Sequence, residues 1–127
     1  MGVRDTTYMK MIVYVYIDGT ICTAGTIPHG EFKDIPSDYT GAKPFLHRIE
    51  HVNRLYNDGK HTIVYWTARG CKSGEIDPLY DLTKKQLKEW GAKYHDLQVG
   101  NKPHFDMYIC DKSFNADLYF NPFPQHD

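Results

Sequence analysis

Residues 11–20 read MIVYVYIDGT, so a run of β-branched and aromatic residues passes directly into Asp-Gly-Thr. A short apolar run that ends at a turn residue is typical of a buried strand, which predicts a strand over residues 11–17. A second run of this kind, Thr62 to Trp66, is followed by Thr67-Ala68-Arg69-Gly70. At both places a predicted strand leads straight into polar, glycine-containing residues.

Between and after these runs, residues recur at the spacing of helices. Pro44 is expected to open a helix that Asn57-Asp58-Gly59 ends, and Gly91 to close a second helix. Weaker strands are expected over residues 94–99 and 105–110, and a short helix over 115–120. The residues that define the two longer helices are Phe45, Ile49, Val52 and Tyr56 in the first and Leu79, Leu82, Gln86 and Trp90 in the second.

This alternation of strands and helices predicts the fold class α/β, as a three-layer sandwich with a central parallel sheet covered on both faces. In such sheets ligands bind beyond the carboxyl ends of the strands, where the polar clusters of this chain fall. The long loop over residues 18–41 has little periodicity and is expected to be functional or mobile, and its part from Ile21 to Gly41 could act as a partial lid.

Length and composition narrow the class of protein. The 127 residues predict one domain over 1–127, with residues 1–9 as a flexible arm and 121–127 as a frayed tail. The 15 Lys and Arg against 16 Asp and Glu give no basic footprint for nucleic acid. No apolar run is long enough to cross a membrane, and no signal segment is evident. Three cysteines without metal-type spacing favour a cytoplasmic protein.

Four segments of the chain carry a combined signal: Tyr16 to Thr20, Trp66 to Gly70, Gly100 to Pro103 and Asp106 to Lys112. In order and spacing they resemble the haloacid dehalogenase-like (HAD) superfamily of phosphatases, over about residues 11–120. The similarity is greatest to its small, capless branch, which includes capsule-biosynthesis-type and phage-encoded sugar-phosphate phosphatases. It implies a Rossmann-like sheet without a cap domain and a small phosphorylated molecule, such as a sugar phosphate, as the ligand. The oligomeric state stays open.

The resemblance also implies roles for single residues. Asp18 matches the general acid and base, which also binds the metal through its backbone. Thr67 matches a hydroxyl donor, and Lys102 matches the lysine that neutralises the phosphate. Gly19 and Thr20 would lie near the phosphoryl oxygens. Asp111 would serve a Mg²⁺ ion, which prefers oxygen ligands.

A guanidinium fork suits phosphate, which makes Arg69 a candidate for binding the substrate. His29, in the long loop, is a weaker candidate for the same role.

The chain departs from the family at two positions. Tyr16 stands where the family carries its nucleophilic aspartate, and Cys110 stands where it carries a metal-binding aspartate. A phenol with a pKa of roughly 10 is neutral and bulky, and a thiol is a soft ligand that suits Mg²⁺ poorly. Catalysis by the usual route is therefore expected to be absent, and Mg²⁺ binding weak or absent. Whether the two residues are natural or engineered replacements stays open.

Other readings of these residues stay open as well. Tyr16 and Cys110 could hold a softer metal such as Zn²⁺ or become joined by oxidation, but packing into an emptied space is favoured. His47 and His51 are spaced as a possible metal pair on a helix, but a solvated face is favoured. The remaining expectations are that Cys22 and Cys71 are ordinary loop residues, that Asp106 supports the site or starts a strand, and that Lys112 pairs with a carboxylate or lies on the surface.

Three hypotheses about function follow. The first is a phosphatase-fold protein with a disabled site, either a pseudoenzyme or an inactivated variant, that retains phosphate binding. The second is an active Mg²⁺-dependent phosphomonoester hydrolase with another nucleophile, for which Asp18 is the nearest carboxylate. The third is a non-catalytic scaffold or assembly module.

Overall fold

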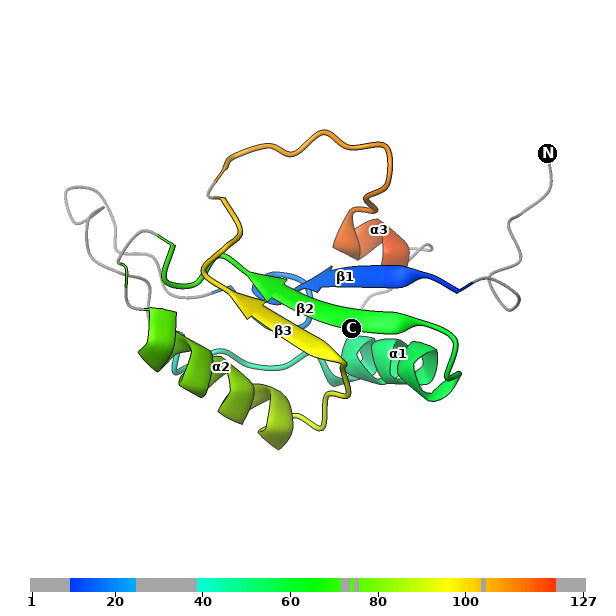
Figure 1. Cartoon of the computed structure of the whole chain (residues 1–127), viewed down its shortest axis with the longest axis horizontal. Helices are drawn as coiled ribbons and strands as arrows, with labels where there is room; N and C mark the ends of the chain where they lie inside the picture. Colours follow the sequence, from blue (N-terminus) through cyan, green and yellow to red (C-terminus); the bar gives the residue numbers. More distant parts are fainter. Residues whose placement is uncertain (1–9, 25–38, 72–73, 75, 104, 121–127) are drawn as a thin grey trace.

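The computed structural model describes residues 10–24, 39–71, 74, 76–103 and 105–120. It is a small α/β protein with a three-stranded parallel sheet in a Rossmann-like layout (Figure 1). The described elements are β1 (Ile12–Tyr16), α1 (Leu46–Asn57), β2 (Thr62–Thr67), α2 (Ile76–Glu89), β3 (Asp96–Val99) and α3 (Ala116–Phe120). No helix in these ranges is both long enough and apolar enough to cross a membrane.

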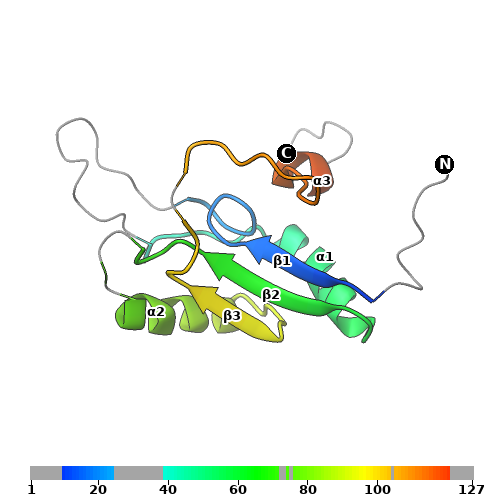
Figure 2. The ribbon, with the colours of Figure 1, turned by 45° about the horizontal axis from the view of Figure 1, so that its top comes forward.

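The sheet order is β1-β2-β3, and both pairs of strands are parallel. The register sets Tyr16 beside Trp66, and Trp66 beside Gln98. Because each new strand is added on the same side and crossovers between parallel strands are right-handed, both crossover helices must lie on one face. Figures 1 and 2 show α1 and α2 together on that face of the sheet.

The core lies between the sheet and these two helices. Successive residues of a strand point to opposite faces, so every second strand residue faces α1 and α2. The residues of this core cluster from the strands and helices are Val15, Ile63, Tyr65, Leu97 and Val99 from the sheet, Ile49 and Val52 from α1, and Leu87 from α2. The stripe expected for the first helix thus supplies the core through Ile49 and Val52, whereas the second helix contributes Leu87, which lies outside the stripe expected for it.

The opposite face of the sheet lacks a comparable helical layer in the described residues. Ile12 and Tyr14 of β1 are 71% and 48% exposed there. The short helix α3 lies near β1 (Figure 1), and the ion pair between Arg48 and Asp117, 2.9 Å long, joins it to α1. The expectation of a sandwich with helices covering both faces is therefore only partly met.

The strand predicted over residues 105–110 is wrong, because this segment is irregular. Phe105 stacks on Tyr108, with ring centres 5.2 Å apart and planes 29° apart. Residues three apart in a strand point to opposite faces, so this stacking is incompatible with an extended strand. Met107 and Ile109 are 77% and 89% exposed as a result. The segment instead arches over the open face of the sheet (Figure 2).

The other predicted elements are present with shifted ends. The third strand begins at Asp96 rather than Tyr94, and the second extends to Thr67. His51 corrects one expectation, since its Nε2 lies 3.1 Å from the Tyr119 hydroxyl and its ring packs edge-on against Phe120. It therefore faces α3 rather than solvent, whereas His47 is exposed. Most of the loop over 18–41, including His29, lies outside the described residues, as do residues 1–9 and 121–127.

Candidate functional site

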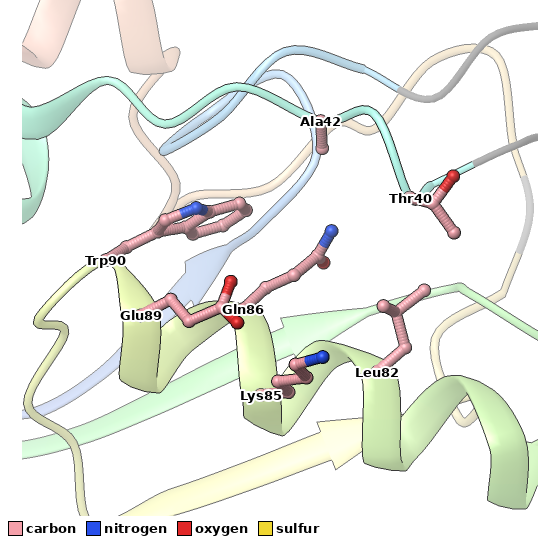
Figure 3. Close-up of a pocket in the computed structure, with 7 residues that line it drawn as sticks. All are labelled: Thr40, Ala42, Leu82, Lys85, Gln86, Glu89 and Trp90. Carbon is pink, nitrogen blue, oxygen red and sulfur yellow. The ribbon is translucent and has the colours of Figure 1, made fainter.

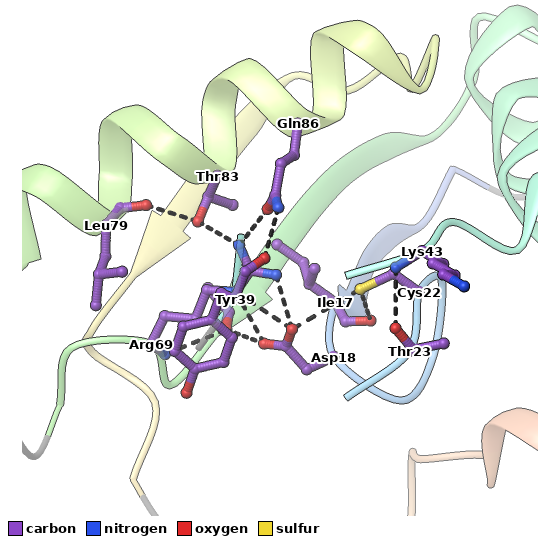
Figure 4. Close-up of polar contacts among 11 residues, drawn as sticks. Ile17, Asp18, Cys22, Thr23, Tyr39, Lys43, Arg69, Leu79, Thr83 and Gln86 are labelled. Carbon is purple, nitrogen blue, oxygen red and sulfur yellow. Dashed lines mark hydrogen bonds and ion pairs between the residues drawn. The ribbon is translucent and has the colours of Figure 1, made fainter. Parts of the chain in front are cut away.

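The carboxyl ends of β1 and β2 bring Asp18 and Arg69 together (Figure 4). Arg69 Nη2 donates to Asp18 Oδ1 at 2.8 Å, and Arg69 Nε lies 3.2 and 3.1 Å from the two carboxylate oxygens. The Thr67 hydroxyl donates to Asp18 Oδ2 at 3.0 Å. Both oxygens of the predicted acid and base are thus engaged by two residues that the sequence also singled out.

Helix α2 holds the other side of the Arg69 guanidinium. Nη1 donates to the Thr83 hydroxyl at 2.9 Å and to Gln86 Oε1 at 2.6 Å. Gln86 Nε2 in turn donates to the Tyr39 carbonyl at 2.7 Å, and the Tyr39 ring lies 4.6 Å from the guanidinium carbon. Arg69 is only 1% exposed. It positions Asp18 and does not face a ligand, in contrast to the expectation that it binds the substrate phosphate.

Cys22 lies beside Asp18 at the side of this network (Figure 4). Its Sγ is 3.6 Å from the Ile17 carbonyl and 3.8 Å from Asp18 Oδ1. Burial, reinforced by the negative charge of Asp18, raises the pKa of the Cys22 thiol to about 12. Cys22 is therefore a core residue that stays protonated, rather than the ordinary loop residue expected from its position.

In the turn after β1, backbone amides donate hydrogen bonds to carbonyl groups of the same turn. Gly19 has a φ of 81°, and its amide donates to the Cys22 carbonyl at 2.9 Å. The Thr20 amide donates to the Ile17 carbonyl at 3.1 Å. Neither amide is therefore open to a phosphoryl oxygen, and what Thr20 can offer a ligand is its hydroxyl.

Tyr16 and Lys102 meet in an aromatic cluster on the open side of the sheet. The Lys102 ammonium lies 4.2 Å from the centre of the Tyr16 ring and 4.2 Å from that of Phe105. An ammonium over an aromatic face is attracted by the ring quadrupole. Burial lowers the pKa of Lys102, although the charges of Cys71 and Asp18 oppose that shift. Burial, with Tyr108 and Cys110 nearby, raises the pKa of the Tyr16 phenol.

A cavity of about 1250 Å³ opens between β1 and the segment that leads into α3. Asp18, Gly19 and Thr20 line one part of it, together with Cys110 and Lys112. The Lys112 amide lies 3.3 Å from Cys110 Sγ, and this contact, with a hydrogen bond from Tyr108, lowers the pKa of the thiol. Tyr16 also lines the cavity, which therefore joins the two positions, Tyr16 and Cys110, at which the sequence differs from the family that it resembles.

A second, smaller pocket of about 290 Å³ lies between α2 and the segment before α1 (Figure 3). Its lining residues are Thr40, Ala42, Leu82, Lys85, Gln86, Glu89 and Trp90. It shares only Gln86 with the network around Arg69.

A chain of amide hydrogen bonds, which sequence reasoning missed, crosses the open face from β3 to β1. Trp66 Nε1 donates to Asn101 Oδ1 at 3.1 Å, and Asn101 Nδ2 donates to Gln98 Oε1 at 3.0 Å. Gln98 Nε2 then donates to the Tyr14 hydroxyl at 3.3 Å. The signal available in the sequence was the alternation in β1, which places Ile12, Tyr14 and Tyr16 on one face.

The magnesium ion that the family resemblance implies does not fit these residues. Both side-chain oxygens of Asp18 already accept hydrogen bonds, which leaves it only the backbone contact that the resemblance implies, and Cys110 offers only a thiol. Asp111 is exposed and does not line the cavity. Within the described ranges, no three His, Cys, Asp or Glu side chains are grouped so that they could hold a metal ion. The same finding gives no support for a Zn²⁺ site at Tyr16 and Cys110.

No family profile and no curated protein sequence matches this chain. In structure it is similar to a target protein from Vibrio cholerae whose crystal structure is known, with a TM-score of 0.67 and 25% sequence identity. The likeness covers 88% of each chain. It extends over most of the molecule and supports the Rossmann-like α/β layout.

Proposed function

We propose that this chain is a HAD-type phosphatase-fold protein whose catalytic centre is disabled and which binds a small phosphorylated molecule. The observation that carries the proposal is the environment of Tyr16. Its phenol stands where the resemblance places the nucleophile. The Lys102 ammonium lies 4.2 Å from the centre of its ring, and Cys110, rather than a second carboxylate, is close enough to affect its pKa. A protonated phenol in this position has neither the charge nor the nucleophilicity that phosphoryl transfer requires.

The charges around the cavity support the binding of an anion. Arg69 neutralises Asp18 through a 2.8 Å ion pair, so the carboxylate repels an approaching phosphate less than a lone charge would. Lys112 lines the cavity, and Lys102 lies close enough to interact with Asp18. Asp117 lines the cavity as well, but Arg48 neutralises it through a 2.9 Å ion pair, so an anion near Thr20 would meet a site of net positive charge.

The first experiment measures the melting temperature of the chain with increasing inorganic phosphate, with chloride at equal ionic strength as the control. A ligand that binds only the folded state raises the melting temperature by mass action. We expect a rise with phosphate that the variant Lys112→Met reduces and that the exposed control Lys84→Met, on α2, leaves unchanged. A melting temperature that does not change with phosphate concentration would overturn the binding part of the proposal.

A second experiment tests the catalytic part. We expect no phosphate release from a generic aryl phosphate by the chain as it stands, with Mg²⁺ or with a chelator. The double variant Tyr16→Asp, Cys110→Asp should gain release that depends on Mg²⁺. Chelator-sensitive release by the original chain would contradict the disabled centre. A folded but inactive double variant would mean that the four motifs mark a fold and not a catalytic site.

A further inference from the structure

Three aromatic side chains lie next to one another on the open face of the sheet, where they line the cavity. The Trp66 ring packs edge-on against Tyr14, with centres 5.4 Å apart and planes at 83°, and against Tyr16, at 5.1 Å and 68°. All three residues line the cavity of about 1250 Å³. Two tyrosines from β1 thus hold one tryptophan from β2 in a fixed orientation, and we call these three residues the aromatic face. The Lys102 ammonium lies over the Tyr16 ring, 4.2 Å from its centre, so Tyr14 and Trp66 are the members that a ligand would contact.

The polar groups next to the aromatic face are already used to hold it. The indole N–H is bound by Asn101, and the Gln98 amide links Asn101 to the Tyr14 hydroxyl. Aromatic groups whose polar atoms are engaged offer a ligand mainly a rigid apolar surface. A bare sugar needs many hydrogen-bonding partners, which this surface does not present. A flat aromatic ring matches this apolar surface better than a sugar does.

The charged part of the cavity lies further along β1. Asp18 and Thr20 follow the strand. Tyr14, the more distant tyrosine of the aromatic face, precedes Asp18 by four residues, or about 13 Å of extended chain, and Tyr16 precedes it by two, or about 7 Å. Lys112 lines the cavity as well. A ligand that reaches both parts needs a flat ring, a spacer and a phosphate. A phosphate attached directly to a small ring is too short, whereas the sugar of a nucleotide supplies the spacer.

We propose that this cavity binds a nucleoside 5′-monophosphate, with its base against the aromatic face and its phosphate near Thr20 and Lys112. The inference rests on the proposed function for the phosphate and adds the chemical class of the rest of the ligand. Base stacking on aromatic side chains tolerates different bases, so the aromatic face is expected to favour a ring without strong preference among bases.

The test compares four probes by titration calorimetry: AMP, adenosine, ribose 5-phosphate and inorganic phosphate. We expect AMP to bind about tenfold or more tightly than ribose 5-phosphate, which shares its sugar and phosphate but lacks the ring. Tyr14→Leu should reduce that preference at least severalfold while leaving the affinity for ribose 5-phosphate unchanged. The matched control is Tyr80→Leu, because Tyr80 is a partly exposed tyrosine on α2 outside the cavity.

A further variant, Asn101→Ala, removes the group that orients Trp66 while leaving the indole present. It should also weaken AMP binding and spare ribose 5-phosphate, which a general loss of folding would not do. Equal binding of AMP and ribose 5-phosphate would overturn the inference and leave the proposed function intact. Equal binding of AMP and adenosine would instead overturn the phosphate site, and with it the proposed function. No binding of any probe would overturn both.

Discussion

The two faces of the sheet are built from alternate residues of the same strands, yet they differ in almost every physical respect. On one face, Ile63 and Tyr65 are fully buried under α1 and α2. On the other, their neighbour Trp66 on β2 is only half-buried and borders a cavity of about 1250 Å³. Burial of apolar area is the main favourable term in folding, so the covered face carries most of the stability. The open face is left available for recognition.

The network around Arg69 lies at the carboxyl ends of the strands, between the covered and the open face of the sheet. It connects the end of β2 to α2 on the covered side, and through Asp18 it reaches the cavity on the open side. Substitutions on the two faces should therefore separate stability from ligand binding, and those in the network should affect both.

Arg69→Met should have the largest effect. It leaves the part-buried Asp18 carboxylate without its cation and removes the partner of Thr83 and Gln86. Loss of one partner of a buried ion pair costs about 3–5 kcal/mol, which chemical denaturation would measure. The control is Arg54→Met, because Arg54 is exposed on α1. Equal small losses for both variants would show that the network adds little to stability.

Gly100→Ala should have the next largest effect, because it strains the turn that leads from β3 to Lys102. Gly100 has a φ of 85°, and an added Cβ would lie 2.8 Å from Ile76 Cγ1. A strained backbone position costs about 1–3 kcal/mol in the free energy of unfolding. In an Ile76→Ala background, the same substitution no longer causes the clash but still causes the backbone strain. Part of the lost free energy of unfolding should therefore be recovered. Full recovery there would show that φ contributes nothing.

Alkaline pH should lower the free energy of unfolding, because the buried Cys22 thiol on the covered side of the sheet then loses its proton. Its pKa is raised in the folded state from 9.0 to about 12, so the folded state binds the proton more tightly than the unfolded chain. The stabilisation is complete below about pH 9 and is lost as the pH rises toward 12, with a slope of at most about 1.4 kcal/mol per pH unit. Cys22→Ala should flatten the pH dependence of denaturation above pH 9. An unchanged slope would contradict the role of this thiol.

The smallest effect comes from a matched pair of isoleucines, one on each face. Ile63 is fully buried. Ile12 lies on the adjacent strand β1, where it pairs with Thr62, the residue before Ile63, and it is 71% exposed. Ile63→Val should cost about 0.5–1.5 kcal/mol in the free energy of unfolding because it leaves a cavity. Ile12→Val keeps the β-branched side chain and should change stability by less than about 0.5 kcal/mol. Equal losses would erase the distinction between the two faces.

The order of strands and helices as far as β3 could be predicted from the sequence because each element has a local signal. The apolar run before Asp18 and the helical spacing around Ile49 depend on neighbours in the chain. The structure of residues 105–110 could not be predicted in this way. The stacking of Phe105 on Tyr108 competes with pairing in a sheet, and no local pattern decides between them.

The place where these polar residues gather was predictable, but their contacts were not. Residues that follow parallel strands converge at one edge of the sheet, which is why Asp18 and Thr67 meet. The direction of Arg69 depends on Thr83 and Gln86, which lie on a helix more than ten residues later. Motif spacing contains no information about that choice, and so the sequence suggested a ligand-binding arginine where the structure has an internal ion pair.

The position of β1 at the end of the sheet also affects how the protein behaves in concentrated solution. Its outer edge pairs with no other strand in the described residues, and Ile12–Tyr16 contains only β-branched and aromatic residues. An uncharged strand of this composition with an open edge is a template for association between chains. Lys10, which is exposed, places a charge just before the strand. A substitution that removes this charge is therefore expected to promote aggregation even where it leaves the fold intact.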